Sequence, residues 1–297
     1  MTAAEQGFLL LTGFFGDPER KPLTVAQFRD LTLRARTMNK PLQNRELTPS
    51  DLTSIGCSKT FAERIVHLLS QQEQLDWYLR EGKGSGCIPI TRISEHYPES
   101  LHRYLGMEAP GALWAKGNTE LLHTPMISLV GSRDLRQDNL TFAREVGKQA
   151  ALQGITLVSG NARGADQAAQ EACLEHGGNV ISVVADELSA QPDRERILYL
   201  SEEGYDLPFS AHRALQRNRI IHVMGEKVFV AQCRLGKGGT WNGTQMNLRK
   251  GWRPVFCYAD GSACAAELEQ MGAVGVTTEA LRSIEALQGP DITFMEL

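Results

Sequence analysis

Residues 158–178 read VSGNARGADQAAQEACLEHGG, a stretch that joins two kinds of sequence. An apolar run at 155–158 leads into its small and polar residues, and an Ala-rich run follows them. This order is typical of a buried strand that turns into a helix. In an open α/β sheet such turns lie at the carboxyl ends of the strands, where ligands bind. The stretch therefore predicts an α/β fold and a ligand-binding edge.

The same alternation of strand and helix continues on both sides of this stretch. Strands are predicted at 127–131, 155–158, 180–185, 228–232, 255–258 and 274–276. Helices are predicted at 138–152, 165–176, 193–203, 212–223, 240–250, 263–271 and 278–287. Such alternation indicates βαβ units. We therefore predict an α/β, Rossmann-like domain, with a mostly parallel sheet flanked by helices and a core that begins near residue 125.

The first part of the chain has a mainly helical pattern instead. Thr48 and Asp51 form a capping box ahead of apolar residues at helical spacing. The sequence EGKGSG at 81–86 predicts a flexible break, after which short extended segments follow. We therefore predict a small helical domain at 1–85 and the Rossmann-like domain at 86–297.

Composition limits the classes of protein to consider. The chain has 297 residues and a net charge of −4, and residues 260–297 hold one basic and seven acidic side chains, so a basic surface elsewhere fits the net charge. The first apolar run, at 8–15, is too short to span a membrane and has no basic residue before it, which predicts a cytoplasmic protein that does not contact membranes.

The six cysteines form no CxxC pair, which favours reduced thiols and no metal site.

Four stretches near predicted strand ends and helix starts are rich in Gly, hydroxyl and basic residues. Gly permits close approach of the backbone, hydroxyl and basic side chains donate to phosphates, and helix N-termini attract anions. The candidate residues for phosphate or nucleic-acid binding are Gly131, Ser132, Arg133, Ser159, Gly160, Asn161, Arg163, Gly164, Arg217, Asn218, Arg219, Lys237, Gly238, Gly239 and Thr240. Arg217 and Arg219 lie about 200° apart around a helix, so we expect one to face the ligand and the other to be structural.

The same stretches contain no recognisable catalytic pair. Asp166 is expected to hold the loop amides, and His212 and His222 are interpreted as ordinary helix residues. Trp241 has two interpretations, stacking on a base or packing in the core. We therefore expect a binding protein without catalytic residues or a cofactor.

The order of these motifs resembles the DprA/Smf family of DNA-processing proteins. VGSR at 130–133, SGNARGAD at 159–166, RNRII at 217–221 and a Gly-rich loop carry the resemblance, which covers residues 85–297. It implies an extended Rossmann-like fold that binds single-stranded DNA in a basic pocket, helps load a RecA-type recombinase and often pairs as a homodimer through its last segment, here 263–268. The implied role is DNA uptake in natural transformation, recombination or, in a divergent member, phage defence.

Several positions depart from the family pattern. Asn161 replaces an apolar residue, Gln170 replaces a His, and the acidic pair at 186–187 follows the third strand. Residues 238–244 also look like the PGGxGTxxE stretch of related phosphoribohydrolases, but residues 245–247 lack the glutamate. The alternative is therefore a nucleotide-ligand sensor or a phosphoribohydrolase-like protein, and a third interpretation is a scaffold.

Overall fold

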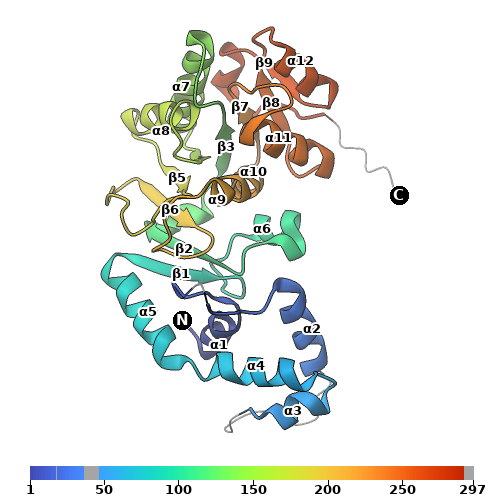
Figure 1. Cartoon of the computed structure of the whole chain (residues 1–297). Coiled ribbons are helices and arrows are strands. Elements are labelled where there is room, and N and C mark those ends of the chain that lie inside the picture. The colour runs from blue at the N-terminus through green and yellow to red at the C-terminus, as the bar shows by residue number, and fades with distance from the viewer. Residues whose placement is uncertain (18, 37–46, 291–297) are drawn as a thin grey trace.

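The structure is a computed structural model that describes residues 1–17, 19–36 and 47–290. Its centre is a nine-stranded sheet in the order β1-β2-β6-β5-β4-β3-β7-β8-β9 (Figure 1). The strands are β1 (Cys87–Thr91), β2 (Ala112–Gly117), β3 (Met126–Val130), β4 (Thr156–Ser159), β5 (Val180–Val183), β6 (Ile197–Ser201), β7 (Val228–Val230), β8 (Val255–Tyr258) and β9 (Val274–Val276). From β6 to β9 all neighbours are parallel, whereas β1 and β2 add an antiparallel edge. The predicted mostly parallel sheet is confirmed.

Helices cover both faces of this sheet, as Figure 1 shows. They are α6 (Glu99–Leu105), α7 (Gln137–Leu152), α8 (Ala165–Glu175), α9 (Ala211–Gln216), α10 (Asn218–Met224), α11 (Gly238–Lys250) and α12 (Ala263–Gln270). Alternate residues of β3 enter opposite cores: Ile127 and Leu129 pack with α7 and α8, whereas Met126 and Val130 pack with α6, α10, α11 and α12. Burial on both faces explains why the parallel strands are almost continuously apolar.

In the N-terminal part, the described residues form five helices, which pack against the antiparallel edge of the sheet. They are α1 (Ala3–Thr12), α2 (Val25–Ala35), α3 (Pro49–Ser54), α4 (Lys59–Leu69) and α5 (Gln72–Gly84). The capping box predicted for Thr48 and Asp51 is confirmed at the start of α3. Tyr78 of α5 packs on Trp114 and Tyr205, with ring centroids 5.1 and 4.4 Å away, and its hydroxyl donates to Asp206 over 2.6 Å. The helical part therefore shares aromatic core contacts with the sheet.

Three predicted helices and the predicted break differ from the structure. The helix predicted at 193–203 is wrong, because its apolar residues form the buried strand β6 between β2 and β5. A short apolar run fits a strand as well as a helix, and only pairing with neighbouring strands decides. The helix predicted at 212–223 is two helices that meet at Arg217, and that at 278–287 is reduced to a 3₁₀ turn, η3 (Glu279–Ser283). The flexible break at 81–86 is instead mostly the end of α5.

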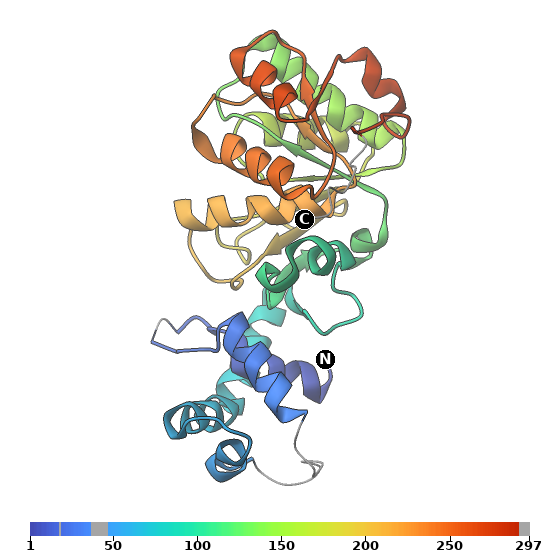
Figure 2. The ribbon, with the colours of Figure 1, turned by 90° about the vertical axis from the view of Figure 1, so that its right-hand side faces the viewer.

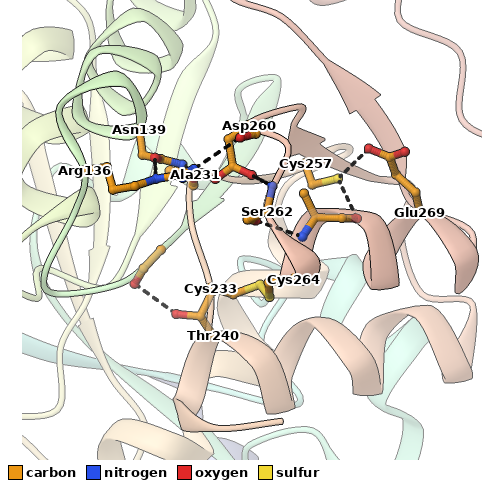
Figure 3. The surroundings of a disulfide bond; sticks show 12 residues. Arg136, Asn139, Ala231, Cys233, Thr240, Cys257, Asp260, Ser262, Cys264 and Glu269 are labelled. Atoms are coloured by element: carbon orange, nitrogen blue, oxygen red, sulfur yellow. Dashed lines mark hydrogen bonds and ion pairs between the residues drawn. A yellow bond between two sulfur atoms is a disulfide. The ribbon is translucent and has the colours of Figure 1, made fainter. Parts of the chain in front are cut away.

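A disulfide corrects the expectation that all the cysteines are reduced. Cys233, which follows β7, is bonded to Cys264 in the first turn of α12, with Cα atoms 6.1 Å apart (Figure 3). The sequence gives no sign of this pair, because the two cysteines are 31 residues apart and meet only when β7 and α12 come together. Cys57, Cys87, Cys173 and Cys257 are free and buried.

Reduction of this disulfide is expected to destabilise the protein. A cross-link that closes a loop of this length lowers the entropy of the unfolded chain and stabilises the fold by about 4 kcal/mol, or roughly 5 °C or more in Tm. Thermal unfolding with and without a phosphine reductant measures the effect. The variant with Cys233→Ala and Cys264→Ala is the control, because its Tm should not respond to reductant. Equal Tm values for the oxidised and reduced wild type would contradict the prediction.

The described residues contain neither a helix that could span a membrane nor a cluster of side chains that could hold a metal ion. No helix there is both long and apolar enough to cross a bilayer. No group of three or more His, Cys, Asp or Glu side chains there is placed to hold a metal ion.

Candidate nucleic-acid interface

A pocket of about 400 Å³ lies at the carboxyl ends of β3 and β7, beside α9, α10 and the start of α11. It contains these residues predicted from the sequence: Gly131, Ser132, Arg133, Arg217, Asn218, Lys237, Gly238, Gly239 and Thr240. It also contains Asp134, Ala162, Asp166, Ala214, Leu215 and Arg234, among others. Three of the four predicted stretches thus bring candidate residues to one hollow, which we call the strand-end pocket, and the stretch at 159–166 contributes only Ala162 and Asp166 to its lining.

The stretch at 159–166, which begins at the end of β4, supports this pocket and contributes few residues to its lining. The backbone N–H of Ala165 donates to the carbonyl of Ser132 over 3.2 Å and so ties the two loops together. Gly164 has a φ of +92°, and a Cβ there would lie 2.4 Å from the Arg133 carbonyl. Only glycine fits such a site without strain. The Gly164 of the sequence motif therefore allows the loop after β4 to lie against the loop after β3.

Two cationic side chains of the pocket are exposed and unpaired. Arg133 and Lys237 form no side-chain hydrogen bond or ion pair with any described residue. Arg234, by contrast, lies 3.4 Å from Asp134, and Arg163 lies 2.8 Å from the same carboxylate. Arg133 and Lys237 are therefore the side chains most available to an anionic ligand.

The N-terminus of α11 adds backbone donors to the same pocket. Lys237 is the N-cap residue and its side chain forms no capping hydrogen bond. The Thr240 hydroxyl donates to the Gly131 carbonyl over 2.9 Å (Figure 3), and the Asn218 amide donates to the Gly239 carbonyl over 3.1 Å. These two bonds fix the helix start against β3 and α10. The first N–H groups of a 13-residue helix then offer partial positive charge to an anion.

Arg217 is buried beneath the pocket rather than presented to solvent. It is 8% exposed, and its guanidinium donates to the carbonyls of Gly160 and Val183. A Cβ on Gly160 would collide with this guanidinium, at 2.4 Å from Nη1, so the glycine makes room for it. Arg217 thus holds the ends of β4 and β5 to the junction of α9 and α10, which is the structural role expected for one arginine of the RNR motif.

Asp166 lies beside Arg217 and is equally buried, at 7% exposure. Its carboxylate accepts from the Ala162 N–H over 3.3 Å, which confirms its expected role in holding the loop. Burial raises the pKa of Asp166 to about 6, although the Arg217 charge and the backbone N–H groups oppose this shift. Desolvation dominates because the charged form loses water on all sides. The pocket floor therefore contains a carboxyl group that titrates close to neutral pH.

Six predicted residues lie outside the lining of the strand-end pocket. Arg219 pairs with Glu202 and donates to the Glu108 carbonyl, on the side of α10 that faces α6. Ser159 is fully buried and accepts from Gln170 Nε2 over 2.6 Å. Gln170, one of the departures from the family pattern, therefore donates to the buried end of β4. The remaining four residues outside the lining are Gly160, Asn161, Arg163 and Gly164.

The other singled-out side chains are structural. Trp241 is 6% exposed and packs in the core with α10 and α12, so the packing interpretation holds and base stacking does not. His222 is fully buried in α10, and its pKa is lowered by desolvation to about 4. His212 contacts Gln216 over 2.9 Å within α9. Sequence reasoning missed Asp134 and Arg234, and the only available signal was their position beside the predicted strand ends.

Comparison with known proteins identifies a family model, described as DNA recombination-mediator protein A, that matches residues 89–280. Protein Smf of Escherichia coli is 32% identical over 160 residues, which are 50% of this chain and 42% of that protein. DNA processing protein DprA of Streptococcus pneumoniae is 34% identical over 157 residues, which are 49% of this chain and 54% of that protein. The chain thus spans about half the length of the curated relatives it matches.

Solved structures show the same fold over more of the chain. The X-ray structure of DprA from Streptococcus pneumoniae superposes with a TM-score of 0.74 at 23% identity and covers 97% of this chain and 99% of that chain. A structure of DNA processing protein A from Helicobacter pylori, described for its single-stranded DNA binding mode, has a TM-score of 0.57 at 22% identity and covers 66% of this chain and 94% of that chain. The first match includes the N-terminal helices as well as the sheet.

Proposed function

Because the chain belongs to the DNA recombination-mediator protein A family, we propose that it binds single-stranded DNA through phosphates held in the strand-end pocket. The observation that supports this most is the combination of two unpaired cations, Arg133 and Lys237, with the uncapped start of α11. A phosphate group takes up both kinds of donor. Proteins named for DNA processing and for single-stranded DNA binding share the fold, which supports the same proposal.

We assign distinct roles to the residues of the proposed site. Ser132, Arg133 and Lys237 contact phosphates. The backbone N–H groups of residues 238–240 donate hydrogen bonds to one of these phosphates. Asn218 positions the start of α11, and Arg217 holds the loops beneath. The donors of the pocket are placed to contact the phosphate backbone of a nucleic acid. Trp241, the side chain considered for stacking on a base, is buried and does not line the pocket. We therefore expect weak sequence preference and a strong dependence on salt.

The test is fluorescence anisotropy with a labelled oligothymidylate and the full chain. Between about 50 and 300 mM salt the affinity should fall roughly thirtyfold or more, as expected for a few neutralised phosphates on a single strand. A duplex of the same length should bind more weakly, because its stacked bases and stiffer backbone do not enter a pocket of this size. Absence of binding at 50 mM salt would overturn the proposal.

The proposal extends to a role without catalysis, as a cytoplasmic adaptor that places single strands for a RecA-type recombinase in DNA uptake, recombination or phage defence. We also propose that the chain divides into a helical domain at 1–85 and a sheet domain at 86–297.

Pairing into a homodimer is part of the same proposal. The apolar side chains Cys264, Ala265 and Leu268 of α12 are buried in the chain's own core, so the pairing surface would use other residues of the last segment. Sedimentation at several concentrations tests the pairing.

A nucleotide ligand is the second candidate, because the volume of the strand-end pocket suits a small molecule. Residues 245–247 lie within α11 and include no carboxylate to serve the hydrolase chemistry of the related stretch, so a nucleotide would be sensed rather than cleaved. Competition separates the two candidates. A mononucleotide that displaces the oligonucleotide at micromolar concentration, with no salt dependence of oligonucleotide binding, would favour the sensor.

The raised pKa of Asp166 predicts that DNA binding strengthens on mild acidification. At pH 7.5 its carboxylate is ionised and repels phosphate, whereas at pH 5.5 it is mostly neutral, given a pKa of about 6. We expect a gain of about three- to tenfold in affinity across this interval, since one charge is removed in a partly buried site. The measurement is oligonucleotide affinity against pH at constant salt.

Asp166→Asn is the control, because its amide oxygen still accepts the Ala162 N–H. This variant should bind at every pH with the affinity of the acidified wild type. A pH dependence that survives in Asp166→Asn would contradict the prediction. The raised pKa of Asp166 also makes the stability of the fold depend on pH. Between pH 3.8 and 6 the folded state binds more protons than the unfolded state, so the free energy of unfolding falls as the pH rises through this range.

A further inference from the structure

An apolar groove of about 670 Å³ lies far from the strand-end pocket, between α1 and α2 on one side and the segment from β1 to η1 (Gly106–Glu108) on the other. Its floor includes Phe8 and Phe28, whose rings meet edge to face with centroids 4.9 Å apart. Figure 2 shows α1 and α2 in the lower part of the molecule, well separated from α10 and α11. The groove is therefore a separate surface and not an extension of the proposed DNA site.

Large apolar side chains stand exposed around this groove. Leu33 is 50% exposed, Ile93 is 49% exposed and Phe14 is 48% exposed, and Val25 and Met107 are exposed as well. Most soluble proteins scatter such residues singly, and a group of them around one concavity marks an interaction surface. The exposed rim side chains are therefore available to a bound chain segment.

One face of α2 forms a wall of the groove. Val25, Phe28, Arg29, Leu33 and Arg36 recur at three- and four-residue spacing, so they lie on one side of the helix and its end. Leu31, on a different side of α2, is buried in the N-terminal core. The helix thus has one apolar side covered by the chain itself and a second apolar side left uncovered.

The charged side chains among the described residues that line the groove are all cationic. Arg29, Arg36 and Arg92 line it, and no Asp or Glu is among the described residues that do. The side chains of Arg29 and Arg36 form no hydrogen bond or ion pair with any described residue. Arg92 already donates to the Gly106 carbonyl over 2.7 Å. Two unpaired guanidinium groups on an otherwise apolar groove complement a ligand that is apolar on one side and acidic beside it.

We propose that this groove binds an acidic amphipathic α-helix of a partner protein. The apolar face of such a helix would lie along α2, with Leu or Phe anchors at i, i+3, i+4 and i+7, and its carboxylates would pair with Arg29 and Arg36. A nucleic acid fits less well, because most of the exposed rim is aliphatic and a single exposed phenyl ring, Phe14, offers little stacking surface. A membrane fits less well because the apolar surface is concave. The chemistry therefore favours a protein helix.

The probe is a labelled helical peptide of about 17 residues, with Leu at a, d and e positions and Glu at the positions that flank this apolar face. A scrambled peptide of the same composition and an analogue with Lys in place of Glu are the ligand controls. Binding is measured by anisotropy with the full chain, with Leu33→Glu and with the double variant Arg29→Glu and Arg36→Glu. Leu152→Glu is the matched control, since Leu152 is 60% exposed on α7, far from the groove. Circular dichroism checks that each variant is folded.

We expect the acidic helix to bind at least about tenfold more tightly than the scrambled peptide or the Lys analogue, and each groove variant to lose about tenfold in affinity. Leu152→Glu should bind as the wild type does. Leu33→Glu should keep full affinity for single-stranded DNA, so failure here is distinguishable from failure of the proposed DNA site. Equal binding of the scrambled peptide or the Lys analogue, unchanged binding by Leu33→Glu, or displacement of the peptide by an oligonucleotide would overturn the proposal.

Discussion

Reversing the charge of both Arg133 and Lys237 to Glu is expected to weaken binding of a single-stranded oligonucleotide about 100-fold at 50 mM salt. Both side chains are exposed, line the strand-end pocket and have no ionic partner among the described residues, so the folded structure should tolerate the change. The substitutions place carboxylates where phosphates are proposed to lie. The slope of log affinity against log salt should also become shallower by about one to two units, because two phosphate contacts are lost.

The control for this experiment changes the net charge by the same amount at a place away from the strand-end pocket. Arg249 and Lys250 are exposed at the other end of α11, and Arg249→Glu with Lys250→Glu should alter oligonucleotide affinity only a few-fold through long-range charge. Equal losses in the two double variants would mean that binding follows net charge alone. That result would contradict the assignment of the pocket as the DNA site.

Removal of the Arg217 side chain is expected to destabilise the protein by about 3 kcal/mol or more. Arg217→Met leaves the carbonyls of Gly160 and Val183 without their donor and leaves the Asp166 carboxylate buried without its neighbouring cation. The measurement is the free energy of unfolding in urea at pH 7.5. Arg163→Met is the control, because the pair between Arg163 and Asp134 is exposed and should contribute less than about 1 kcal/mol.

The double variant Arg217→Met with Asp166→Asn separates charge from packing. It should recover part of the lost stability, because no unpaired carboxylate remains buried. If Arg217→Met unfolds at the same urea concentration as Arg163→Met, the buried role of Arg217 is contradicted. Substituting Arg217 and Arg219 together would therefore be a poor test of DNA binding, since the first affects the fold and the second lies outside the pocket.

Much of the fold can be predicted from the local sequence, because the interactions that determine these strands, caps and turns are between residues close in the chain. The strands near 127–131, 155–158 and 255–258 were predicted within one or two residues, since runs of buried apolar residues bounded by Gly and polar residues have few other structures. The capping box at Thr48 and the Gly164 turn are equally local, as each depends on residues a few positions away or on a single φ angle. The three stretches that surround the strand-end pocket were predicted together, because parallel strands bring their carboxyl ends to one edge.

What only the tertiary structure decided depends on contacts between distant parts of the chain. Strand β6 is a strand because β2 and β5 pair with it on either side. Arg217 and Arg219 are two positions apart in one motif, yet one is buried under the loops and the other pairs with Glu202. The disulfide between Cys233 and Cys264 and the groove beside α2 likewise have no sequence signature. The sequence by itself determined most of the elements of the parallel sheet and the chemical character of the strand ends. Burial and the direction of each side chain were decided by packing, because they depend on which distant residues come to surround it.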